Sequence, residues 1–165
     1  MKTKRILTLA VLLCFFMTSC CKKAPWLEVT TENADTHYHS TSVNGVTIAS
    51  EQVVFRATFQ WQGDIVQPLP QAFGGVYYGK THNLSVNNNL GSTRLIEIGE
   101  GIYIFEESYD FDFVDINKSP KDENITDLFA PGDTMYYRAY AKVINGANDT
   151  NYIYGEERFT VMAGE

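Results

Sequence analysis

Apolar and polar residues alternate with a period of two along much of the chain after residue 26. A period of two places successive side chains on opposite faces of a β-strand. The clearest run covers residues 53–62, where one face is apolar and the opposite face is polar apart from Val54. The apolar face consists of Val53, Phe55, Ala57, Phe59 and Trp61. We predict from this run a strand that contributes five side chains to a core.

A second alternating run covers residues 131–143 and opens with the turn signal Pro131-Gly132. We expect one face to pack in the core, through Met135, Tyr137, Ala139, Ala141 and Val143. We expect the other face to meet solvent, through Tyr136, Arg138, Tyr140 and Lys142. A further strand is predicted at residues 152–161, close enough in sequence to form a hairpin with the first.

Shorter strand signals fill the rest of the chain, at residues 26–31, 73–79, 95–98, 101–105 and 109–116. Polar segments separate them, at residues 32–45, 87–89 and 117–127. The chain after residue 26 has no amphipathic run of helical length. Together these signals predict an all-β fold, a single sandwich of seven to eight antiparallel strands.

Composition and charge narrow the function classes. Hydrophobic residues make up 44% of the chain and aromatic residues 13%, enough for a packed core. Removal of the first 19 residues takes away three basic residues and no acidic one, which leaves 10 basic against 20 acidic residues, a net charge of −10. Because such a surface repels polyanions, we expect no nucleic-acid partner.

The three cysteines, Cys14, Cys20 and Cys21, all lie within the first 21 residues. The body of the protein therefore has no disulfide, no thiol nucleophile and no cysteine-ligated metal site. We expect its fold to be stabilised by the hydrophobic core alone.

The N-terminus has the pattern of a cleaved secretory signal over residues 1–19. Lys2, Lys4 and Arg5 precede a 12-residue apolar run at positions 6–17, which is too short to span a bilayer as a helix. A cleaved signal can precede a protein that is held in the membrane by a lipid. The alternatives are cleavage with full secretion and a free-standing transmembrane helix.

Residues 17–20, Met-Thr-Ser-Cys, resemble a bacterial lipoprotein box. The resemblance implies that Cys20 carries acyl chains and holds the protein in the outer membrane, with residues 20–25 as a tether. This tether contains Lys22 and Lys23, where some Bacteroidetes lipoproteins carry an acidic run that resembles a surface-export signal. A periplasm-facing and a surface-exposed position both remain open.

Three blocks, at residues 75–83, 129–141 and 154–160, resemble the fibronectin type III-like domains of Bacteroidetes lipoproteins. The resemblance spans residues 26–162 and implies an immunoglobulin-like sandwich, with little information about activity. In that alignment Met135 occupies the position of a corner tyrosine that normally hydrogen-bonds across a turn. Either Tyr136 replaces it after a shift of one residue, or packing holds the corner.

One face of the predicted strands carries candidate binding residues. Tyr77, Tyr136, Arg138 and Tyr140 are expected to form an outward row across two paired strands. Aromatic rings beside an arginine are suited to stacking on a sugar or anchoring a protein partner. The alternative is cross-strand pairing that only stabilises the sheet.

Two clusters have the side chains of a metal site. Asp110, Asp112, Asp115 and Asn117 offer the oxygen ligands that Ca²⁺ prefers, but the glycine of an EF-hand loop is missing. Asp35, His37 and His39 would share one face of a strand. The alternatives are an acidic solvated face for the first cluster and a polar loop or edge strand for the second. We expect no other cofactor.

Catalytic motifs are absent from the sequence, including nucleophile elbows, zinc-protease motifs and glycine-rich phosphate loops. We therefore expect a non-enzymatic binding or structural module. It would be anchored in the lipid bilayer through acylated Cys20 and contact an unidentified envelope protein or glycan. A glycan-binding accessory lipoprotein of a polysaccharide-utilisation system and a Ca²⁺-dependent adhesin are the alternatives.

Overall fold

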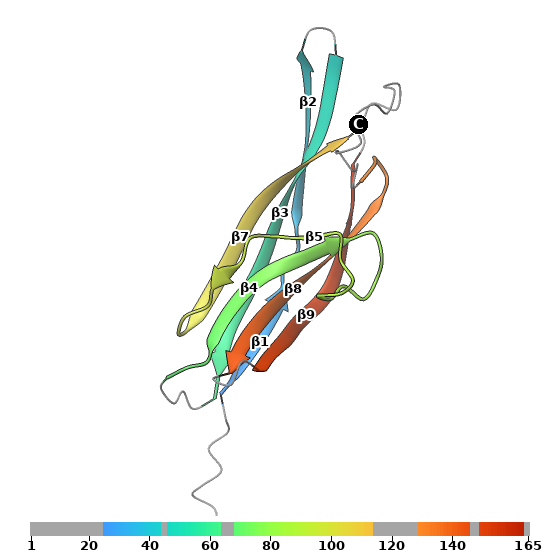
Figure 1. The fold of residues 1–165 in the computed structure, drawn as a ribbon. Helices are drawn as coiled ribbons and strands as arrows, with labels where there is room; N and C mark the ends of the chain where they lie inside the picture. The colour runs from blue at the N-terminus through green and yellow to red at the C-terminus, as the bar shows by residue number, and fades with distance from the viewer. Residues whose placement is uncertain (1–24, 44–45, 64–67, 114–128, 146–148, 164–165) are drawn as a thin grey trace, which may run out of the picture.

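The computed structural model describes residues 25–43, 46–63, 68–113, 129–145 and 149–163, without the side chains of residues 41–48 and 112–113. The fold is all-β: of the described residues, 71% lie in strands and none in a helix, and the strands form two antiparallel sheets (Figure 1). Within these described ranges no helix is long and apolar enough to cross a membrane. The all-β prediction is confirmed.

The first sheet is built around one long strand, β3 (Val46–Gln62). Its other members are β1 (Trp26–Thr31), β2 (Asp35–Val43) and β7 (Ile102–Phe113). Both β1 and β2 pair with one edge of β3, β1 at residues 57–62 and β2 at residues 46–54, while β7 pairs with the opposite edge. The β2–β3 hairpin projects beyond the second sheet at the top of Figure 1.

The second sheet is centred on β4 (Gln71–Gly79) and β8 (Thr134–Asn145), which pair with each other. The far edge of β8 pairs with β9 (Asp149–Val161). Two short strands, β5 (Gly91–Ser92) and β6 (Ile96–Glu97), pair with β4. The strand order is therefore β1-β3-β7 in the first sheet, with β2 extending the line of β1, and β4-β8-β9 in the second.

The core lies between the sheets and uses the two faces that the alternation predicted. All five predicted core residues of β3 and all five of β8 are buried. Phe55 of β3 packs against Tyr78 of β4 and Tyr137 of β8, at ring-centroid distances of 5.9 and 5.7 Å. These aromatic contacts join the two sheets across the middle of the sandwich.

Strand boundaries differ from the predictions where the sequence is polar. The strands predicted at residues 101–105 and 109–116 form a single strand, β7 (Ile102–Phe113), and residues 114–116 lie outside the described residues. The β3 strand begins at Val46, seven residues before its predicted start, and pairs there with β2. Backbone hydrogen bonds form such a ladder whatever its side chains are, so it need not carry a hydrophobic alternation.

The two sheets meet directly where β1 passes β9. The Ala139 backbone N–H donates to Thr31 Oγ1 at 3.0 Å, and Arg158 Nε donates to the Thr31 carbonyl at 2.6 Å. A Cβ at Gly155 would lie 2.6 Å from Thr31 Oγ1 and 3.0 Å from the Val29 carbonyl oxygen. Only glycine at position 155 lets the strands approach this closely.

The corner before β8 is held by Asp133 and by packing. The Asp133 carboxylate accepts from the Ala130 N–H at 2.9 Å and pairs with Lys80 Nζ at 2.7 Å. Met135 is fully buried. Tyr136 does not replace the corner tyrosine, because its ring lies on the outer face, 4.0 Å from the ring of His82.

Candidate functional site

The segment between β4 and β5 folds back over the outer face of the second sheet. Leu84 of this segment is fully buried. Asparagines hold the turn closed: Asn88 Nδ2 donates to the His82 and Asn83 carbonyls, and Asn89 Nδ2 donates to the Ser85 carbonyl. Asparagine tolerates the left-handed backbone conformation that Asn83 adopts, with φ of 66°. We call residues 80–90 the covering segment.

Tyr77 and Tyr140 lie beneath the covering segment, so the prediction that both rings face solvent is wrong. Their exposed fractions are 6% and 3%, and their rings stack 3.7 Å apart with an interplanar angle of 5°. With Leu84 they form a second hydrophobic cluster, outside the main core. Burial raises the pKa of both hydroxyl groups.

Arg138 and Glu157 fasten the covering segment to the sheet. Arg138 Nε donates to the Gly155 carbonyl at 2.7 Å, and its guanidinium lies 4.8 Å from the ring of Tyr154. Glu157 accepts from the Leu84 N–H at 2.8 Å and lies 2.9 Å from His82 Nδ1. Arg138, predicted as a ligand contact, is therefore engaged in structural hydrogen bonds.

Four aromatic side chains remain at least partly exposed on this face, and we call them the aromatic face. They are Tyr136, Tyr152, Tyr154 and Phe159. Phe159 is 65% exposed and lies 6.3 Å from Tyr136 across the β8–β9 pair. The Tyr152 and Tyr154 rings are 6.3 Å apart and nearly parallel, at 15°.

A β-bulge in β9 brings the members of the aromatic face together. Tyr154 and Phe159 are five positions apart, an odd offset, so strict alternation would place them on opposite faces. The register with β8 shifts by one between Arg138 and Tyr140, from Arg138↔Glu157 to Tyr140↔Tyr154. The extra residue returns Tyr152 and Tyr154 to the outer face. Strict alternation therefore missed them, and Gly155 was the only sequence signal of the irregularity.

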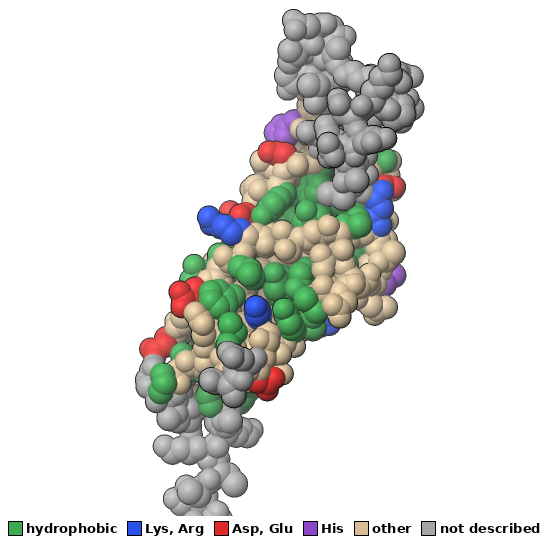
Figure 2. All heavy atoms as spheres, in the orientation of Figure 1, with side chains coloured by type: hydrophobic (Ala, Val, Ile, Leu, Met, Phe, Trp, Pro, Cys, Tyr) green, Lys and Arg blue, Asp and Glu red, His purple; other side chains and the backbone are tan. Residues whose placement is uncertain are grey.

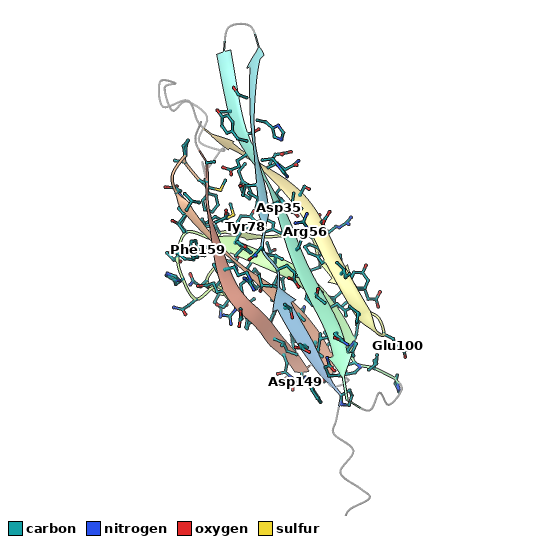
Figure 3. The ribbon with its side chains drawn as sticks, turned by 180° about the vertical axis from the view of Figure 1, so that it is seen from behind. Asp35, Arg56, Tyr78, Glu100, Asp149 and Phe159 are labelled. Atoms are coloured by element: carbon teal, nitrogen blue, oxygen red, sulfur yellow. The ribbon has the colours of Figure 1, made fainter. Side chains whose placement is uncertain are left out.

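The histidine cluster forms no metal site among the described residues. His37 and His39 lie in β2, as the edge-strand alternative expected, and so does Asp35. The Asp35 carboxylate pairs with Arg56, whose Nε also binds Glu106 at 2.6 Å (Figure 3). The hydrogen bond from Arg56 lowers the pKa of Asp35. Nowhere in the described part of the chain do three His, Cys, Asp or Glu side chains gather in a metal-binding arrangement.

The predicted Ca²⁺ ligands fall mostly beyond the described residues. Asp110 is exposed, and its carboxylate accepts from Gln52 Nε2 at 3.3 Å. Asp112 belongs to β7, but its side chain is not described, and Asp115 and Asn117 lie outside the described residues. The Ca²⁺ site remains a prediction, as does lipidation at Cys20, which also lies outside them.

A buried carboxyl group closes one end of the core. Glu51 lies two residues before Val53 on the inward face of β3, and its exposed fraction is zero. Neither carboxylate oxygen has a hydrogen bond of good geometry, although Thr36 and the Ala163 backbone lie close enough to favour the charged form. Burial raises the pKa of Glu51.

Chemically, the aromatic face offers stacking surfaces and apolar contact but no nucleophile paired with a base. Its exposed rings are suited to a flat apolar or sugar surface. The scan against protein-family models and the search of curated proteins find no match for this chain.

Proposed function

We propose that this protein is a lipid-anchored, non-enzymatic binding module of the outer membrane, with the aromatic face as its contact surface. The exposed position of Phe159 beside Tyr136 carries the proposal, because a large apolar ring at 65% exposure gains most from a partner that covers it. The Cys20 box supports the anchor. The periplasm-facing and surface-exposed positions are both compatible with this role.

We further propose that the sandwich is of the immunoglobulin or fibronectin type III kind. Immunoglobulin-like domains place strands A, B and E in one sheet and strands C, F and G in the other. The orders β1-β3-β7 and β4-β8-β9 correspond to these sets, and β5 and β6 lie beside β4 where strand C′ would lie. An experimental structure of a homologous protein with a different strand order would contradict this assignment.

The anchor is tested by membrane fractionation of cells that express the full chain. The Cys20→Ala variant should move to the soluble fraction, whereas the matched Cys21→Ala variant should remain in the membrane fraction. Retention of the Cys20→Ala variant in membranes would contradict lipidation at this position.

The contact surface is tested by Phe159→Ala, which removes an exposed ring with little effect on the core. Leu95→Ala is the matched control, because Leu95 is 47% exposed and lies outside the aromatic face. An envelope protein that co-purifies with the wild type and the Leu95→Ala variant should be lost with Phe159→Ala. Equal recovery with both variants would contradict the assignment.

A glycan is the second candidate ligand, favoured by the nearly parallel rings of Tyr152 and Tyr154. Sugar rings stack on such aromatic surfaces. A glycan array probed with the full chain should show binding that the Tyr152→Ala variant loses. An array without any bound glycan would leave the protein-partner proposal in place and remove this one.

A further inference from the structure

The outer face of the first sheet carries exposed apolar side chains at one end. Ile102 and Ile104 of β7 are 63% and 74% exposed, and Trp26 of β1 is 48% exposed. Glu28 of β1 pairs with Gln60 of β3, which pairs with Ile102. Residues paired across a sheet share a face, so Trp26, Ile102 and Ile104 all project from the same surface. We call these three residues the apolar end.

The apolar end lies where the described chain begins. Trp26 opens β1, and Figure 3 places Glu100, just before β7, at the same end of the sandwich. Figure 2 shows the opposite side of the molecule, that of the second sheet, where hydrophobic side chains are exposed as well. Cys20 lies six residues before Trp26, and six residues of chain reach at most about 20 Å. An acyl anchor at Cys20 would therefore keep the apolar end within about 20 Å of the bilayer surface.

Polarity changes sharply with distance from this end. Along the outward face of β7, Ile102 and Ile104 are followed by Glu106 and Asp110. On β3, Gln60 and Thr58 pair with the two isoleucines. The next outward residue of β3 is Arg56, which forms ion pairs with Asp35 and Glu106. Near the tether this face therefore carries three exposed apolar side chains among uncharged polar ones, with Glu28 as its charged residue, whereas beyond Ile104 the face is charged. Glu28 accepts from Gln62 Nε2 at 2.8 Å.

We propose that the apolar end docks on the phospholipid surface, with Trp26, Ile102 and Ile104 in the interfacial layer. The proposal rests on the lipid anchor at Cys20. Tryptophan favours the membrane–water interface, where its ring is apolar and its N–H is solvated. Docking would orient the sandwich, so that the charged part of the first sheet stands in water. A second copy of the chain is a poorer occupant, because the net charge of −10 after signal removal repels it.

The acidic side chains at this end predict a lipid preference. Glu28 shares the face of Trp26, and Figure 3 places Glu100 and Asp149 at the same end of the sandwich; all three are exposed and repel anionic headgroups. Docking should therefore be stronger on zwitterionic phosphatidylcholine than on vesicles rich in phosphatidylglycerol. This order distinguishes apolar docking from electrostatic adsorption of a basic surface.

Tryptophan fluorescence tests the proposal, because the chain has only two tryptophans and Trp61 is buried, at 6% exposure. The processed full-length lipoprotein is reconstituted into phosphatidylcholine vesicles with and without bromine near the glycerol end of the acyl chains. We expect bromine to quench Trp26. The Ile102→Ser/Ile104→Ser variant should show roughly twofold less quenching, because its end binds the interface less tightly.

The Trp26→Phe variant is the matched control, since it keeps only Trp61 and should show no quenching. Equal emission of the wild type in brominated and plain vesicles, with the protein floating with the vesicles, would overturn docking and leave the anchor intact. If quenching is absent and the protein forms dimers on the vesicles, the apolar end is a contact between copies. A protein that does not float with vesicles overturns both the anchor and the docking.

Discussion

The outer faces of the two sheets are built in different ways. The first sheet exposes its outer face, where Arg56 forms ion pairs with Asp35 and Glu106. The outer face of the second sheet is partly enclosed, because the covering segment buries Leu84 over the stacked rings of Tyr77 and Tyr140. The same two-residue alternation therefore yields a solvated surface on one sheet and a second small core on the other.

The difference shows that the polar side of an alternating strand is not always its solvent side. Tyrosine on that side can be buried when a neighbouring segment covers it, since its ring is apolar and its hydroxyl needs only a partner. Ion pairs on the open sheet are solvated and contribute little to stability. We expect substitutions on the enclosed face to be costly and those on the open face to be mild.

The largest contrast should come from one buried ring and one open position. Tyr140→Ala should lower the free energy of unfolding by about 3 kcal/mol, because it leaves a cavity beneath Leu84. Gln60→Ala, on the outer face of the first sheet, should change it by less than about 0.5 kcal/mol. Urea unfolding of both variants measures the two values. Similar losses would show that the two outer faces are equally important for stability.

Next in size is the junction of the sheets at Gly155. Gly155→Ala should destabilise by about 2 kcal/mol, because the added Cβ meets Thr31 and the β1 backbone. Gly99→Ala is the control, since a Cβ there meets no atom within 4 Å. Thermal unfolding compares the variants. A neutral Gly155→Ala would mean that β1 does not approach the bulge closely.

The enclosed carboxyl Glu51 predicts a smaller, pH-dependent effect. Its pKa is raised above the ordinary value of 4.5, so the folded state holds the proton more tightly than the unfolded state. Stability should therefore fall as pH rises from about 4.5 through the raised pKa of Glu51. Glu51→Gln should stabilise the protein at pH 8 by about 1 kcal/mol, by removing a buried charge. Melting curves between pH 4 and 8 test this, and a destabilised variant at pH 8 would contradict it.

The exposed carboxyl Asp35 should show the smallest effect, with the opposite sign. Arg56 lowers the pKa of Asp35 below its ordinary value of 3.8. The contribution of this ion pair to folding stability is present above pH 3.8 and is lost as pH falls through the lowered pKa of Asp35. Asp35→Asn should lower the melting temperature slightly at pH 7, and this difference should shrink as pH falls through the lowered pKa of Asp35. A larger decrease at pH 2 than at pH 7 would contradict the ion pair.

The sequence by itself determined the all-β class and the two faces that form the main core. An alternation over about ten residues gives a strand one apolar face. Phe55 and Ala139 lie on such faces, so they must be buried whichever strand lies beside theirs. The polar hairpin of β2 and β3 escaped prediction because backbone pairing leaves no hydrophobic pattern. The predicted anchor likewise rests on a short local pattern, the residues that end at Cys20.

Only the tertiary structure decided which outward residues meet solvent. Tyr77 and Tyr140 were placed correctly on the outer face, yet the covering segment buries them through contacts with Leu84 that no local pattern records. Tyr154 reached the same face only because the bulge at Gly155 shifts the register against β8. Burial on an outer face depends on which distant segment lies above it, whereas strand alternation depends only on the local backbone.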